Sequence, residues 1–158
     1  MSIMRDLPEA SRVFVFGTAE ERSALQARFG LTDDDMRRFT HYATLRHNVL
    51  SRLQTDGDCS IEIEPQVAEA VRKLNQKGYK TFSSGFASAG EAQHLSCSDA
   101  PFHPAIIPEE ILDRLADFDL QFIVTSHAIT FQSSRLLSLE ELTFIWNRVA
   151  DALPPRTT

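Results

Sequence analysis

One segment constrains the fold more than any other: at residues 61–84 an amphipathic helical pattern runs directly into a strand-like pattern. Apolar residues recur at helical spacing from Val67 to Leu74, and Gly78 follows the expected last turn. The stretch YKTFSS then alternates and carries β-forming residues, which predicts a strand. A helix joined to a strand in this way buries its apolar stripe on a sheet, so we expect both element types in one domain.

The remaining segments predict further helices and strands around this unit. Capping-box spacings occur at Thr18–Glu21 and at Ser138–Glu141, each of which marks the start of a helix. Helices are expected at 18–30, 32–57, 61–78, 108–118 and 138–153, and strands at 12–17, 79–84, 102–107 and twice within 120–132. The expected core residues are Leu74, Ile111, Leu115, Phe122, Val124, Ile145, Trp146 and Val149.

The fold class that follows is α+β, with a small mixed or antiparallel sheet covered by helices and a helical N-terminal layer. Residues 1–57 are expected to form this layer, 58–153 the α+β core of the same domain, and 154–158 a tail. The helix after residue 32 should bury Met36, Phe39, Ala43, Leu50 and Leu53.

Composition narrows the class of protein. Apolar residues make up 42% of the 158-residue chain and charged residues 24%, which is typical of a globular domain. The net charge of −6 disfavours non-specific attraction to nucleic acid or anionic membrane. Two cysteines do not make a disulfide framework, and the N-terminus lacks an apolar signal core. No apolar run approaches the length of a membrane span, so we expect a soluble cytoplasmic protein.

A stretch of small residues at 83–90 is the first candidate site. Small side chains let backbone amides approach a ligand, and serine hydroxyls can hydrogen-bond a phosphate. The stretch matches neither a Walker loop nor a dinucleotide fingerprint, and no base is evidently within reach of a nucleophile. The candidate ligand-binding residues are Ser83, Ser84, Gly85, Ser88, Gly90, Asp58, His94 and His103.

A second candidate combines thiol and imidazole groups. Zinc needs about four such ligands in a tetrahedron, and His94, Cys97 and His103 lie close together in the sequence. Cys59 or His127 would be the fourth ligand. There is no paired Cys-x-x-Cys motif, so we expect neither a metal nor another cofactor.

A third candidate is the basic face of the helix predicted after residue 32. Between Met36 and Leu53 the sequence contains no acidic residue, although the whole chain is acidic. Such a local reversal of charge can meet an acidic protein surface or nucleic-acid phosphate, whereas a plain solvated helix face is the alternative. The candidate partner-binding residues are Arg37, Arg38, His41, Arg46 and Arg52.

Residues 61–85 resemble a segment of tRNA wybutosine-synthesis methyltransferase-like proteins and of small uncharacterised bacterial proteins. The matching positions are Leu74, Asn75, Gly78, Tyr79, Thr81, Ser83 and Ser84. Gly85 stands where those proteins have cysteine, and Ala87 and Ser88 where they have glycine and an arginine or histidine. The resemblance therefore implies the helix–turn–strand architecture and not the activity.

These observations favour a non-catalytic binding or regulatory module whose partner is a protein. One alternative is a small enzyme or a nucleotide- or anion-binding domain that uses the stretch at 83–90. A second alternative is an RNA-associated protein that uses the arginine face, which the resemblance also suggests.

Overall fold

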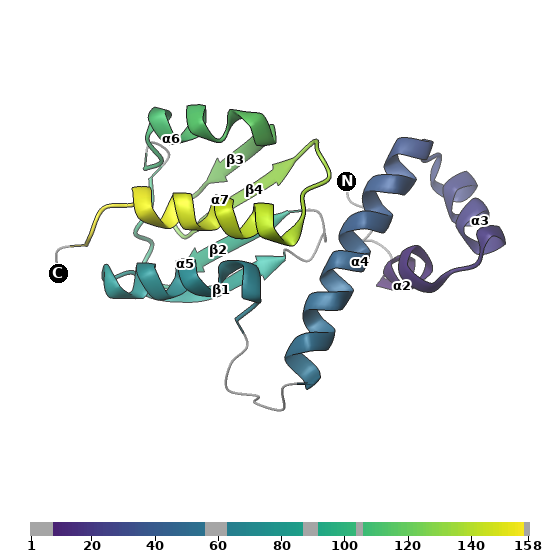
Figure 1. The fold of residues 1–158 in the computed structure, drawn as a ribbon, viewed down its shortest axis with the longest axis horizontal. Coiled ribbons are helices and arrows are strands. Elements are labelled where there is room, and N and C mark those ends of the chain that lie inside the picture. Colours follow the sequence, from purple (N-terminus) through teal and green to yellow (C-terminus); the bar gives the residue numbers. More distant parts are fainter. Residues whose placement is uncertain (1–7, 56–62, 87–91, 104–105, 157–158) are drawn as a thin grey trace. The chain divides into compact units, whose positions relative to one another are not determined.

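The structure is a computed structural model that describes residues 8–55, 63–86, 92–103 and 106–156. It confirms the α+β class, with six α-helices and a four-stranded antiparallel sheet among these residues (Figure 1). The chain forms two compact units: residues 1–59 with 86–91, and residues 60–85 with 92–158.

The N-terminal unit contains three helices: α2 (Pro8–Phe16), α3 (Ala19–Phe29) and α4 (Asp33–Thr55). The capping box predicted at the start of α3 is present, since the Thr18 side chain accepts from the Glu21 amide and Glu21 accepts from the Thr18 amide. Thr32 and Asp35 form the same reciprocal pair of bonds at the start of α4. Local sequence therefore fixes where both helices begin.

The prediction of a strand at 12–17 is wrong, because most of this segment lies in α2. Valine and phenylalanine favour strands, but here Ala10 and Phe14 lie four residues apart on one helical face and are buried. Phe14 also contacts Phe39 of α4, with ring centroids 5.5 Å apart. Packing of this face on the other two helices outweighs the local preference for a strand.

Helix α4 buries a face rotated slightly from the predicted one. Tyr42, Ala43 and Val49 are buried, whereas Leu50 is exposed, contrary to the prediction. Met36 and Phe39 are half-buried, and the side chain of Leu53 lies outside the described residues. The exposed Leu50 lines a surface groove.

The sheet has strand order β1-β2-β4-β3 and belongs to the C-terminal unit except for Phe86, the last residue of β1. Its strands are β1 (Thr81–Phe86), β2 (Gln93–Cys97), β3 (Leu120–Val124) and β4 (Ala128–Ser133). In the central pair His94 lies opposite Thr130, and in the next pair Thr130 lies opposite Ile123. Side chains alternate between the two sheet faces, so these residues share one face and Leu95, Ile129 and Phe131 share the other.

Helices α5 (Pro65–Gln76) and α7 (Leu139–Ala152) pack against each other over the face that carries Leu95 and Phe131 (Figure 1). The Ser138–Glu141 capping box predicted for α7 is present, whereas α5 begins at Pro65, later than the predicted residue 61, with this proline in its first turn. Trp146 is the largest fully buried side chain, and its ring centroid lies 4.9 Å from that of Phe131. The core of this unit lies between the helix pair and the sheet.

Other predictions for this unit need correction. The strand predicted at 102–107 is absent from the described part of that segment, where the Ile106 amide instead donates to the His103 carbonyl. The helix predicted at 108–118 is α6 (Glu109–Arg114) followed by a 3-10 turn, η1 (Ala116–Phe118). Strand β2 was not predicted at all.

Most of the expected core is confirmed, since Leu74, Leu115, Ile145, Trp146 and Val149 are buried. Ile111, Phe122 and Val124 are only half-buried. Phe122 and Val124 belong to β3, an edge strand, and an edge strand has a neighbour on one side only.

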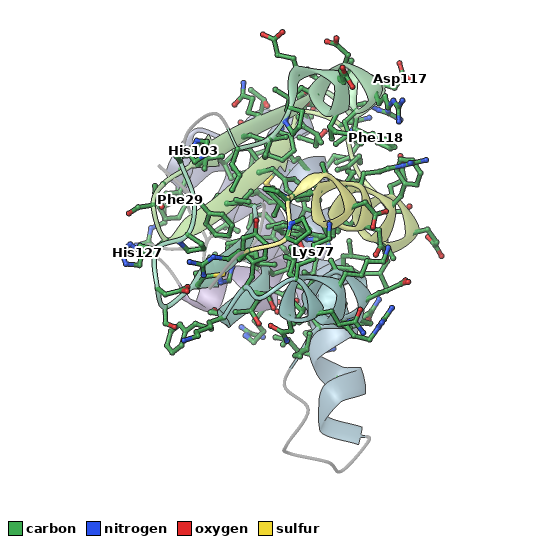
Figure 2. All side chains as sticks on the ribbon, turned by 90° about the vertical axis from the view of Figure 1, so that its left-hand side faces the viewer. Phe29, Lys77, His103, Asp117, Phe118 and His127 are labelled. Atoms are coloured by element: carbon green, nitrogen blue, oxygen red, sulfur yellow. The ribbon has the colours of Figure 1, made fainter. Side chains whose placement is uncertain are left out.

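Lys77 closes the C-terminal end of α7. Its ammonium group donates to the carbonyls of Ala150 and Leu153 at 2.7 Å and of Asp151 at 3.2 Å (Figure 2). The last carbonyls of a helix have no partner within the helix, and a cation there also interacts favourably with the helix dipole. Lys77 is the C-cap residue of α5, and its side chain therefore also caps the C-terminal end of α7.

Replacing Lys77 with methionine should lower the free energy of unfolding by about 2 kcal/mol, because charge-assisted hydrogen bonds are lost while the apolar stem is kept. Urea denaturation measures the change. Lys80→Met is the matched control, since Lys80 is exposed and should change stability by less than about 0.5 kcal/mol. Equal effects of the two substitutions would contradict the role given to Lys77.

None of the helices in the described residues is long and apolar enough to cross a membrane.

Candidate functional site

The stretch at 83–90 is not simply a loop. Ser83, Ser84 and Gly85 lie in β1, while Ser88 and Gly90, like Asp58, lie outside the described residues. His94 lies in β2, the neighbouring strand, and His103 is an exposed residue beyond it. The structure therefore brings Ser83 and His94 together in a hydrogen bond, whereas no side-chain hydrogen bond joins His103 to either of them among the described residues.

Ser83 and His94 form a direct hydrogen bond. Ser83 Oγ lies 2.8 Å from His94 Nε2, and His94 Nδ1 lies 3.2 Å from the carbonyl oxygen of Gly85. A carbonyl only accepts, so in the neutral ring Nδ1 carries the proton and Nε2 accepts from the serine hydroxyl. The expectation that no base lies within reach of a nucleophile is therefore wrong.

Gly85 has a structural reason for being glycine. Its φ is +108°, a conformation that other residues rarely adopt, and a Cβ atom here would overlap the Glu64 carboxylate. Glu64 is 9% exposed and accepts from Gln66 Nε2 at 3.1 Å. The same nitrogen lies 3.1 Å from Gln93 Oε1, which also accepts from Trp146 Nε1 at 3.0 Å. A buried polar network thus lies directly beneath the strand that carries Ser83.

Of the residues considered as metal ligands, Cys59 lies outside the described residues, and the others do not form a metal-binding group. Burial raises the pKa of the Cys97 thiol to about 11, with Asp99 adding to the effect, so the thiol is protonated at neutral pH. His94 is bonded to Ser83, whereas His103 and His127 are exposed (Figure 2). Within the described ranges no group of three or more His, Cys, Asp or Glu side chains could hold a metal ion.

The residues of the predicted arginine face differ in their exposure and in the contacts they make. Arg37 is exposed but forms an ion pair with Asp34 one turn earlier. Arg38 is half-buried, and His41 makes an edge contact with the ring of Tyr42. The side chain of Arg52 lies outside the described residues. Arg46, another of the five predicted partner-binding residues, lines a surface groove.

This groove lies between α2 and α4 in the N-terminal unit and has a volume of about 260 Å³. Its apolar part is formed by Val15, Phe16, Ala43 and Leu50, and its charged and polar part by Arg12, Arg46 and His47. Phe16 is 62% exposed, and its ring meets that of His47 edge-on at 4.9 Å. A large exposed aromatic side chain beside cationic groups is typical of a binding surface.

The charges around the groove are only partly neutralised. Arg12 lies 3.7 Å from Glu21, and both side chains are exposed, so this ion pair is weak. Among the residues described by the structure, Arg46 has no acidic partner. The sequence indicated Arg46 as a partner-binding residue, but Arg12 and Phe16 were not recognised beside it, because residues 12–17 were predicted to form a strand.

Comparison of the chain with protein-family models, with curated proteins and with solved structures finds no match.

Proposed function

We propose that the protein is a non-catalytic binding module that holds a segment of another protein in the α2–α4 groove. The segment we expect carries one large apolar side chain flanked by carboxylates. The observation that carries the proposal is the exposed ring of Phe16 in the same groove as the guanidinium of Arg46, which has no acidic partner within the described part of the chain.

Burial supplies the affinity in this proposal. Covering the exposed part of Phe16 together with Leu50 removes apolar surface from water, and aromatic and arginine side chains dominate the energetics of most interfaces. Carboxylates on the partner would meet Arg46 and Arg12 at the edge of the groove. The apolar part of the groove therefore favours a large apolar side chain, and its charged part favours carboxylates on the same segment.

Two features favour a protein over RNA as the partner. Asp33, Asp34 and Asp35 form an acidic first turn at the start of α4, and Asp34 already pairs with Arg37. The chain as a whole carries a net charge of −6, which disfavours a phosphate backbone.

Selection of peptides from a phage-displayed library of random 12-mers on the full chain tests the proposal. We expect enriched peptides with aspartate or glutamate around a Phe, Trp or Leu. The double variant Phe16→Ser/Arg46→Glu should bind a synthetic selected peptide at least about 30-fold more weakly, as expected for loss of an interface hot spot. Fluorescence polarisation measures this affinity.

The chain offers a matched control elsewhere on its surface. Phe144 of α7 is 43% exposed, and the Arg148 guanidinium lies 5.0 Å from its ring centroid. Phe144→Ser/Arg148→Glu makes the same chemical change and should leave peptide binding intact. Equal losses in both double variants would refute the groove, as would a labelled single-stranded RNA that binds more tightly than any peptide and dissociates steeply with salt.

A further inference from the structure

A second site lies on the sheet of the C-terminal unit and is independent of the groove. We propose that Ser83 is a nucleophilic acyl acceptor, activated by His94, which forms an ester with activated carboxylic esters and thioesters. The juxtaposition of a serine hydroxyl, an imidazole base and a group that orients the base carries this proposal.

The first argument is the direction of the hydrogen bonds. Because Gly85's carbonyl accepts from His94 Nδ1, the Nε2 lone pair points at Ser83 Oγ at 2.8 Å, within the range needed for proton abstraction. The carbonyl fixes the tautomer, which is the task of the third group in a nucleophile–base–orienter arrangement. Gly85 itself lies close against the buried Glu64 carboxylate, so the orienting carbonyl belongs to a residue that packs on the polar network beneath β1.

The second argument is access. The Ser83 side chain is exposed and His94 is half-buried, so a reagent reaches the hydroxyl while the base stays positioned. β1 is an edge strand of the sheet, so among the described strands β2 is its one hydrogen-bonded neighbour.

Two nearby serines show what is particular to Ser83. Ser96 lies on β2, two residues beyond His94, but its hydroxyl donates to the Ser83 carbonyl at 3.3 Å and has no imidazole partner in the described structure. Ser84 follows Ser83 in β1, and alternation along a strand places its side chain on the opposite face. Both are matched controls for reactivity.

The reaction needs no further co-reactant. Ser83 Oγ attacks the carbonyl carbon of the donor as its proton passes to His94 Nε2. The tetrahedral intermediate then collapses, and the bond from carbon to the leaving oxygen or sulfur breaks. The leaving group takes up the proton from Nε2, which leaves an O-acyl serine, a free alcohol or thiol, and neutral His94.

Acetylation by p-nitrophenyl acetate tests the proposal on the full chain. Release of p-nitrophenolate gives the rate, and peptide mass spectrometry locates the acetyl group. We expect one acetyl group on Ser83, abolished there by Ser83→Ala and formed at least about 100-fold more slowly in His94→Gln, as expected for loss of a general base. Ser84→Ala and Ser96→Ala should react at the wild-type rate, and circular dichroism checks that each variant is folded.

Three results would overturn the proposal: no acetyl group on Ser83, a rate on Ser83 unchanged by His94→Gln, or equal acetylation of Ser84 and Ser96. The groove variant Phe16→Ser/Arg46→Glu should acetylate normally, so failure of this proposal is distinguishable from failure of the proposed function.

Discussion

Replacing Gly85 with alanine should lower the free energy of unfolding by about 3 kcal/mol or more. The added methyl group meets two separate costs, because a φ of +108° strains any residue with a Cβ and because the methyl group overlaps the Glu64 carboxylate. Glu64 cannot move away freely, since it is buried and bonded to Gln66, whose amide also holds Gln93. Chemical denaturation measures the loss.

Gly30 provides the control for backbone strain alone. It ends α3 with a φ of +61°, and a Cβ atom there would have no neighbour within 4 Å. Gly30→Ala should therefore cost only about 1 kcal/mol, the typical price of a left-handed residue with a side chain. Suppose that Gly85→Ala lowers the free energy of unfolding no more than Gly30→Ala does. The Glu64 carboxylate then does not approach β1 as closely as the structure shows.

Truncation of Leu74 to alanine is expected to cost about 2–5 kcal/mol, as removal of a fully buried leucine does. Leu74 is 1% exposed and belongs to α5, which packs against α7 over the sheet. Leu112→Ala in α6 makes the same chemical change at a position that is 38% exposed. Its cost should stay below about 1 kcal/mol. Similar costs in the two variants, measured by urea denaturation, would show that α5 does not bury this face.

The parts of the fold that the sequence predicted correctly depend on local signals. Thr18–Glu21 and Ser138–Glu141 mark helix starts through hydrogen bonds three residues apart, so neighbouring residues suffice to identify them. The apolar stripe of α5 likewise lies within one element. These features do not depend on what the distant parts of the chain do.

The errors occur where distant residues decide the structure. Residues 12–17 have strand propensity, and only burial of Phe14 against the other helices makes them helical. Strand β2 alternates buried Gln93, Leu95 and Cys97 with half-buried His94 and Ser96, but glutamine, histidine and serine are not strong β-formers. Its pairing with β4 places it in the sheet.

The candidate sites show the same division. Ser83, His94 and Arg46 were recognised as residues capable of chemistry or binding, because residue type is visible in a sequence. That Ser83 and His94 face each other depends on how β1 and β2 are placed in the sheet. That Arg46 shares a groove with Phe16 depends on how α2 packs on α4. Neither relation leaves a periodic pattern in the sequence.

The pairing of α5 with α7 has a consequence during protein synthesis. Translation delivers α5 and all four strands before Leu139, so the growing chain can hold the whole sheet while half of its helical cover has yet to leave the ribosome. Until then Phe131 lacks the ring of Trp146, and the sheet face that also carries Leu95 and Ile129 is covered only in part. The unit therefore reaches its final state only once α7 has emerged, and nascent chains stalled before that point should be the ones that proteases and chaperones recognise.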